Sequence, residues 1–246
     1  MDLPRQFLIR EGDLRILNPF SPAKLADLGR VLKLTPGTTL TDFCSGRGEM
    51  LCTWARDYGI TGTGVDISVK WTREAQQRAD ELGVQADFHH SDAAHFVSPD
   101  KSDIAACIGA TWIGDGVEGT IEILERSLKP GGMLLIGEPY WRLDPPDQET
   151  VTACHMAAKE DLRDLPGLLA HFGELGYDVV EMMLSNSDDW DRYEAAHWLN
   201  VRRWLDANPG DPLWAEMRAE LDTAPVSHVR YQREYLGWGV FALIKR

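Results

Sequence analysis

Asp42, Asp66 and Asp92 each stand at the end of a predicted strand, where carboxylates can bind a nucleoside. A carboxylate at such a position accepts hydrogen bonds from ribose hydroxyls, an adenine amine or an ammonium group. Any one of the three alone is equally typical of a solvated turn or a helix cap. In this order, on three successive strands, they predict a site shaped for an adenosine-containing ligand.

A glycine-rich turn follows the first of these strands and reads Cys44-Ser45-Gly46-Arg47-Gly48. Glycine lets the main chain pass close to a ligand where a side chain would collide. A nicotinamide-dependent oxidoreductase also needs such a turn and an acid after the second strand. Its G-x-G-x-x-G pattern, however, would put Leu51 at the third glycine and Asp42 beside a pyrophosphate. A cationic ligand suits Asp42 better.

The elements that must position these residues alternate between strand and helix through the first half of the chain. Predicted strands cover residues 40–43, 61–67, 86–92, 102–108, 133–137, 177–184 and 237–244, and predicted helices cover 49–58, 69–82, 116–128, 149–159 and 168–175. This alternation predicts an α/β fold, a doubly wound, mostly parallel seven-stranded sheet with helices on both faces. Ligands of such sheets bind at the carboxyl ends of the strands.

The chain of 246 residues has the length of one domain, which we expect to cover residues 1–246. Residues 1–20 form an N-terminal segment with a short amphipathic helix and an extended part. Residues 186–236 form a mostly helical, aromatic and acidic cap inserted before the last strand, with a break at residues 208–210.

The charge of the chain argues against polyanionic partners. Lysine and arginine total 25 against 39 acidic residues, which gives a net charge of −14. Such a field repels nucleic acid and anionic membranes, so neither is an expected partner. The sequence begins without a signal-peptide pattern and has no stretch long enough to span a bilayer, so we expect a cytoplasmic protein. Its four cysteines, none in a CxxC pair, are expected to be reduced.

Several motifs resemble those of the class I S-adenosylmethionine-dependent methyltransferases. Their acid and glycine-rich turn correspond to residues 42–48, although Cys44 replaces the first glycine. Their ribose-binding acid corresponds to Asp66, and their acid beside the adenine to Asp92. Their Lys-Pro-Gly-Gly turn before the fifth strand stands at residues 129–132. The resemblance is strong over residues 20–140.

The resemblance implies S-adenosylmethionine as cofactor and a Rossmann-like fold. It implies as cofactor-binding residues Asp42, Cys44, Ser45, Gly46, Gly48, Asp66, Ile67, Trp71, Asp92, Ala93 and Gly109. We expect Cys44 to keep an ordinary backbone angle, with its thiol near the cofactor or simply packed. Trp71 or Trp112 could face the sulfonium, or both could be core residues.

The acceptor of the methyl group is expected near the fourth and fifth strands. The exit of the fourth strand, residues 109–115, lacks the Asn-Pro-Pro-Tyr type of sequence found in enzymes that methylate nucleobase or glutamine amides. After the fifth strand, Glu138 is our first candidate for a general base or acceptor anchor, and Tyr140 is the second. A purely structural hydrogen bond is an equal alternative for either residue.

The predicted cap places Trp190, Tyr193, Glu194, His197 and Trp198 within about two helical turns. One interpretation is a helix whose aromatic side chains pack on the sheet. The other is a lid that encloses a small acceptor, with His197 or Glu194 handling a proton.

His89 and His90 suggest a metal site at first sight. Adjacent residues of a strand point to opposite faces, so the two rings cannot easily bind one ion. We therefore expect no metal.

The motifs together predict methyl transfer from S-adenosylmethionine to a small molecule by in-line displacement. A binding protein for S-adenosylmethionine or S-adenosylhomocysteine without turnover would share every donor-site feature. A nicotinamide-dependent oxidoreductase is the remaining alternative. The acceptor and the oligomeric state do not follow from the sequence.

Overall fold

The computed structural model describes residues 3–246 and contains a seven-stranded sheet in the order β3-β2-β1-β4-β5-β7-β6. The strands are β1 (Thr39–Phe43), β2 (Thr61–Asp66), β3 (Ala86–His90), β4 (Ser102–Ile108), β5 (Leu128–Trp141), β6 (Tyr177–Leu184) and β7 (Leu236–Lys245). Strands β1 to β5 pair in parallel, whereas β7 is antiparallel to both β5 and β6. This confirms the predicted fold class.

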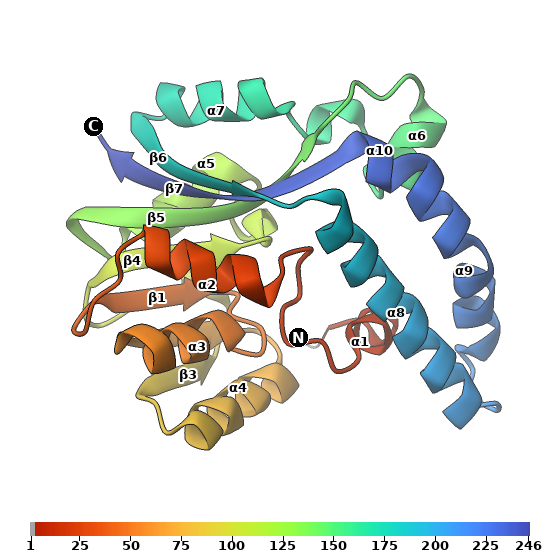
Figure 1. The fold of residues 1–246 in the computed structure, drawn as a ribbon, viewed down its shortest axis with the longest axis horizontal. Helices are drawn as coiled ribbons and strands as arrows, with labels where there is room; N and C mark the ends of the chain where they lie inside the picture. Colours follow the sequence, from red (N-terminus) through yellow and green to blue (C-terminus); the bar gives the residue numbers. More distant parts are fainter. Residues whose placement is uncertain (1–2) are drawn as a thin grey trace.

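Helices connect the strands and cover both faces of the sheet (Figure 1). They are α1 (Arg5–Glu11), α2 (Pro22–Val31), α3 (Glu49–Tyr58), α4 (Val69–Leu82), α5 (Val117–Glu125), α6 (Gln148–Ala153), α7 (Leu165–Glu174), α8 (Ser187–Ala207), α9 (Trp214–Ser227) and α10 (Arg233–Tyr235). Helix α4 begins where Ser68 Oγ accepts a hydrogen bond from Trp71 N, and it ends at Gly83 in the left-handed conformation. These are ordinary helix signals, and the predicted bounds of α3 and α4 agree with the structure.

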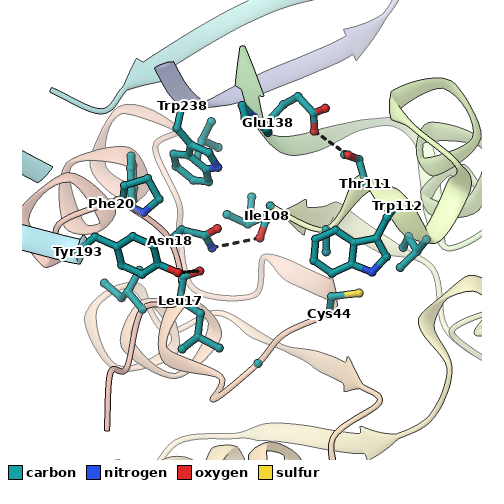
Figure 2. A pocket seen from close by; sticks show the side chains of 18 of the residues that line it. Leu17, Asn18, Phe20, Cys44, Ile108, Thr111, Trp112, Glu138, Tyr193 and Trp238 are labelled. Atoms are coloured by element: carbon teal, nitrogen blue, oxygen red, sulfur yellow. Dashed lines mark hydrogen bonds between the residues drawn. The ribbon is translucent and has the colours of Figure 1, made fainter. Parts of the chain in front are cut away.

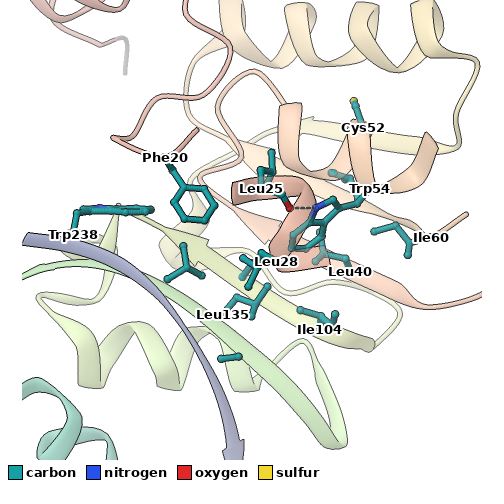
Figure 3. Close-up of a cluster of buried hydrophobic side chains, with 14 of the residues drawn as sticks. Phe20, Leu25, Leu28, Leu40, Cys52, Trp54, Ile60, Ile104, Leu135 and Trp238 are labelled. Carbon is teal, nitrogen blue, oxygen red and sulfur yellow. Dashed lines mark hydrogen bonds between the residues drawn. The ribbon is translucent and has the colours of Figure 1, made fainter. Parts of the chain in front are cut away.

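Each face of the sheet has its own apolar core. On one face, Leu25 and Leu28 of α2 and Trp54 of α3 pack over β1, β4 and β5 (Figure 3). The indole N–H of Trp54 donates to the carbonyl of Leu25 over 2.9 Å, which joins α3 to α2. On the other face, α5 and α7 pack over alternate residues of the same strands. The sheet is therefore buried on both sides, as a parallel sheet requires.

Strand β5 is longer than its sequence predicted. The expected strand ended at residue 137, but the observed strand continues to Trp141 because it pairs with β7 from Met133 to Trp141, for example Tyr140 with Gly237. The helix predicted over residues 149–159 is shorter and ends at Ala153. The extension of β5 places residues 138–141 within the strand.

The predicted cap before the last strand is present as α8, α9 and α10. Figure 1 shows α8 and α9 standing beyond the carboxyl ends of the parallel strands, with α1 against α8. A separate apolar cluster joins these helices through Val201 and Leu205 of α8, Met217 of α9 and Ile9 of α1. Within residues 3–246, no helix is long and apolar enough to cross a membrane.

Candidate active site

A row of functional positions crosses the sheet at its carboxyl edge. In strand order it contains Asp92, Asp66, Asp42, Gly109 and Glu138. The first four lie at or just beyond the ends of β3, β2, β1 and β4, and Glu138 lies in β5 beside the end of β4. Neighbouring strands lie roughly 4.8 Å apart, so the row spans roughly 19 Å. All five residues line one cavity of about 1220 Å³. Figure 2 shows the part of its wall around Glu138. Pockets for one drug-sized ligand are roughly 300–1,000 Å³, so this cavity has room for two small molecules.

Asp66 is held in a fixed orientation by the main chain. Its Oδ2 accepts from Gly46 N and its Oδ1 from Ser68 N, each over 2.8 Å. Burial raises the pKa of this carboxyl, and the two N–H donors oppose that effect. The carboxylate thus bridges the glycine turn and the start of α4, and it retains acceptor capacity toward the cavity.

Asp42 is buried and accepts no hydrogen bond from the rest of residues 3–246. The residue lies at the end of β1 and is only 3% exposed. Burial, with a smaller contribution from the charge of Asp66, raises its pKa to about 8. Because a buried charge is costly unless it is paired, this carboxylate is suited to a cationic ligand group.

Cys44 adopts a left-handed backbone conformation with φ of 59°, so the expected ordinary backbone angle is wrong. The chain reverses directly after β1, where Ser45 N donates to Val65 O and Gly48 N donates to Ser45 O, each over 2.9 Å. A left-handed residue with a side chain costs roughly 1–2 kcal/mol. The turn therefore keeps the conformation of its usual glycine although a cysteine occupies the position.

The other residues of the turn divide between cavity and core. Ser45 and Gly46 line the cavity, and Ser45 Oγ is buried without a hydrogen-bond partner among the described residues. Gly48 does not line it: a Cβ there would come within 2.5 Å of the ring of Phe88. Gly48 thus makes room for packing between α3 and β3.

Asp92 lies at the more exposed end of the row. It caps the short helix Ala93–His95 by accepting from Ala94 N, and its Oδ2 is 3.1 Å from His95 Nδ1. Ala93 and Ile67 line the cavity beside it. The three residues therefore line the same cavity.

Glu138 is the buried carboxyl at the other end of the row. Thr111 Oγ1 donates to Glu138 Oε2 over 2.7 Å, and no bond within residues 3–246 reaches Oε1 (Figure 2). Burial raises the pKa of Glu138 to about 7, against the effect of the Thr111 hydrogen bond. Such a group exchanges protons near neutral pH.

Comparison with known proteins decides the family. Residues 41–132 match the family described as "Methyltransferase domain". The uncharacterized protein YjhP of Escherichia coli K12 is 57% identical over the whole of both chains. A SAM-dependent methyltransferase of Geobacter sulfurreducens, solved in complex with S-adenosyl-L-homocysteine, is 58% identical, with a TM-score of 0.98 over 100% of this chain and 99% of that one. Its counterpart from Thiobacillus denitrificans, in complex with the same compound, is 56% identical with a TM-score of 0.98 over all of both chains.

The chain belongs to the class I S-adenosylmethionine-dependent methyltransferases. This confirms the predicted family and the prediction that the protein is an enzyme. It also favours the methyltransferase interpretation over a nicotinamide-dependent oxidoreductase and over a binding protein without turnover.

Two other candidate catalytic residues of this methyltransferase do not line the cavity. Tyr140 was expected in an open stretch after the fifth strand, but β5 continues through it and its ring packs on Gly237 within the apolar core. His197 lies behind the cavity wall, with Nε2 3.4 Å from Glu11 Oε1 and Nδ1 3.9 Å from Glu194 Oε2. Burial lowers the pKa of His197, but the two carboxylates outweigh it and raise the pKa to about 9. His197 is therefore a buried cation at neutral pH.

The two tryptophans considered for the sulfonium are in different settings. Trp71 is buried and lines the cavity, and its ring centroid is 5.7 Å from that of Phe7 and 5.9 Å from the guanidinium carbon of Arg47. Its indole nitrogen has no hydrogen-bond partner in residues 3–246. Trp112 also lines the cavity but is 70% exposed.

The N-terminal segment contributes wall residues that the sequence did not predict. Asn18 Nδ2 donates to Ile108 O over 3.2 Å, and a Cβ on Gly109 would come within 2.2 Å of Asn18 Oδ1. Arg47 Nη1 donates to Leu14 O over 2.8 Å, which joins the glycine turn to this segment. The one local signal in the sequence was an arginine, Arg47, between the two glycines of the turn.

The paired histidines of β3 have other contacts. His89 lies against Phe96 with ring centroids 5.9 Å apart, whereas His90 Nε2 donates to Ile67 O over 2.9 Å. In the part of the chain that the structure describes, no group of three or more His, Cys, Asp or Glu residues has the arrangement of a metal site.

Proposed function

We propose that this methyltransferase moves the methyl group of S-adenosylmethionine to a small-molecule acceptor held in the same cavity. The observation that carries the proposal is the continuity of that cavity, which runs from the carboxylates of Asp92, Asp66 and Asp42 to Glu138 without a dividing wall. A cavity of about 1220 Å³ can hold both molecules at once.

The donor half fits S-adenosylmethionine by its chemistry. Asp66 would bind the ribose hydroxyls, Asp92 and Ala93 the adenine, and Asp42 a cationic group of the donor. Two features call for a polar ligand here: among the described residues, neither the buried Asp42 carboxylate nor the buried Ser45 hydroxyl has a hydrogen-bond partner. The bound donor supplies a methyl group on a positively charged sulfur that leaves as a neutral thioether.

The protein's own contribution would be alignment and exclusion of water. In-line displacement needs the reacting atoms about 3–3.5 Å apart and collinear with the leaving group. Leu17, Asn18 and Phe20 of the N-terminal segment close one side of the cavity, which would keep water from the reacting atoms. Glu138 is the candidate general base or acceptor anchor, because it lies in this cavity with a pKa near neutrality.

Calorimetric titration tests the donor half. We expect S-adenosylhomocysteine to bind and reduced NAD not to bind; the reverse result would overturn the proposal. The activity is tested by incubating the enzyme with methyl-labelled donor and a metabolite extract. We expect labelled product and acceptor-dependent release of S-adenosylhomocysteine, and binding without any such release would instead support a non-catalytic binding protein.

The acid-rich composition supports a small acceptor over nucleic acid. The net charge of −14 opposes a phosphate backbone, and arginine and lysine contribute only Arg15 and Arg47 to the cavity wall within residues 3–246.

A further inference from the structure

The part of the cavity beyond β4 has an apolar and aromatic wall, which we call the acceptor chamber. Its apolar residues come from the N-terminal segment, α2, α8 and β7: Phe20, Leu28, Trp190, Leu236, Trp238 and Val240. The rings of Phe20 and Trp238 are tilted against each other with centroids 5.5 Å apart. A wall of this kind binds an apolar body with a flat ring.

The ionised groups of the acceptor chamber are acidic. Glu138, Glu194, Glu160 and Asp161 line it. The two arginines of the cavity wall belong to its donor half and are engaged there: Arg47 Nε is 3.0 Å from Glu74 Oε2, and Arg15 Nη2 is 4.0 Å from Glu81 Oε2. His155 also lines the chamber, and its Nε2 accepts from Gln232 Nε2 over 2.9 Å. Among the residues that the structure describes, the acceptor chamber therefore offers carboxylates but no arginine or lysine to an anionic acceptor.

Only one of these carboxylates is both buried and incompletely bonded. Asp161 Oδ2 accepts from the N–H groups of Ala157 and Ala158, so it organises its own loop. Glu194 pairs with His197, and Glu160 is exposed. Glu138 is 9% exposed, and one of its carboxylate oxygens accepts a hydrogen bond from Thr111. Its other oxygen accepts none from residues 3–246. It is the group that needs a ligand.

We propose that the acceptor is a primary or secondary amine on an apolar, ring-containing body, with its ammonium group bound by Glu138 and its body packed against the wall that Phe20, Trp190 and Trp238 form. This proposal rests on the proposed function, because it assigns the substrate class of the same site. A nearby cation would also favour the ionised form of Glu138, whose pKa burial raises to about 7.

The position of Glu138 suits this chemistry. It lies in β5, the strand next to β4, one residue after Gly137, which pairs with Ile108, so it is roughly one strand spacing, about 4.8 Å, to the side of Gly109 at the exit of β4. The bound ammonium group passes one proton to the Glu138 carboxylate, which frees the nitrogen lone pair. That pair forms the new N–C bond while the C–S bond of the donor breaks and its electron pair stays on sulfur. The product is the methylated ammonium, and the proton on Glu138 returns to water.

Three probes that share one ring system test the proposal. Tryptamine carries an ammonium group, tryptophol a hydroxyl and indole-3-propionate a carboxylate on the same indole body. Each is titrated calorimetrically into enzyme saturated with S-adenosylhomocysteine. We expect tryptamine to bind at least about tenfold more tightly than the other two, because only its ammonium group can form a charge-assisted hydrogen bond with the Glu138 carboxylate.

Variants assign that preference to the carboxylate. In Glu138→Gln, whose amide oxygen can still accept from Thr111, the preference for tryptamine should disappear while S-adenosylhomocysteine binding stays within about twofold. Glu122→Gln, an exposed glutamate of α5 outside the cavity, should keep the preference. Equal binding of the three probes, tighter binding of the carboxylate, or no binding of tryptamine at millimolar concentration overturns the amine proposal. Failure of S-adenosylhomocysteine to bind would instead overturn the proposed function.

Discussion

Leu17 lies against Gly46, so closely that a Cβ on Gly46 would come within 2.9 Å of Leu17 Cδ1. The glycine turn therefore packs against the N-terminal segment and also lines the cavity. The same segment places Asn18 against Gly109 at the exit of β4. The absence of side chains at these two glycines thus lets residues 17–18 close the cavity beside the donor half.

Arg47 should hold this closure in place. Its guanidinium is buried and donates to the carbonyls of Gly12 and Leu14, and Arg47→Ala would leave both carbonyls without that donor. We expect a loss of about 2–3 kcal/mol in the free energy of unfolding and weaker binding of S-adenosylhomocysteine. Faster amide hydrogen exchange confined to residues 12–20 would identify local opening.

Arg73→Ala is the matched control, because Arg73 is an exposed arginine of α4. It should change the unfolding free energy by no more than about 0.5 kcal/mol. Unchanged exchange in residues 12–20 of the Arg47→Ala variant would show that the segment does not depend on this arginine.

Asp66→Ala should weaken S-adenosylhomocysteine binding by about 1.5–3 kcal/mol, the range for hydrogen bonds to a charged group. The variant loses the acceptor for ribose and also the partner of Gly46 N and Ser68 N. Asp66→Asn retains one acceptor oxygen and should lose less. Calorimetry measures both, with the exposed Asp87→Ala of β3 as control, and an unchanged dissociation constant would remove Asp66 from the site.

Local patterns were sufficient for the elements that carry the donor residues. Helix α4 was predicted with its observed bounds because Ser68 caps it and Gly83 ends it, and both signals lie within the helix's own sequence. The strands that carry Asp42 and Asp66 were also predicted, because the pattern that indicates each strand lies within its own sequence. The edge where their carboxyl ends meet then follows from the parallel order of the sheet.

Contacts between distant parts of the chain could not be predicted. Tyr140 is in the core because β7, almost 100 residues later, extends β5 through it. His197 faces Glu11 of α1, and the packing of α1 on α8 leaves no local pattern in either helix. The covering of the cavity by Leu17 and Asn18 has the same origin.

Asp42 should make the stability of the free enzyme depend on pH. Burial raises the pKa of its carboxyl from an ordinary value of 3.8 to about 8. Between these two pH values the carboxyl is therefore protonated in the folded state and ionised in the unfolded state. A carboxyl of this kind contributes stability below pH 4 that is lost as the pH rises through about 8. Asn cannot ionise, so the Tm of Asp42→Asn relative to the parent should increase with pH across this window.

Thermal unfolding at a series of pH values measures this difference. One kcal/mol corresponds to a shift of roughly 2–4 °C in the Tm of a chain of this size. Asp100→Asn, at an exposed acid, should show no such trend. We also expect Asp42→Asn to bind S-adenosylhomocysteine more weakly, so a constant Tm difference with unchanged binding would contradict the role of Asp42.

Cys44→Gly should be more stable than Cys44→Ala by about 1 kcal/mol, because alanine keeps the cost of a left-handed backbone and glycine does not. Urea unfolding of the two variants gives the difference directly. Cys154 is the opposite case, since it is buried with φ of −87°. There the alanine variant should be the more stable by roughly 0.5–1 kcal/mol. The same sign at both positions would refute the backbone explanation.

Glu138→Gln should lower turnover much more than donor affinity. General base catalysis contributes roughly 10²–10⁴-fold, so we expect a loss of that order in kcat with the acceptor that the extract assay identifies. The base is the carboxylate, whose fraction rises with pH through about 7 because burial raises the pKa of Glu138 to that value. The kcat/KM of the parent enzyme should therefore rise with pH and level off above about 7, whereas the variant should lack this limb. Equal losses of turnover and donor affinity would instead assign Glu138 a structural role through its bond with Thr111.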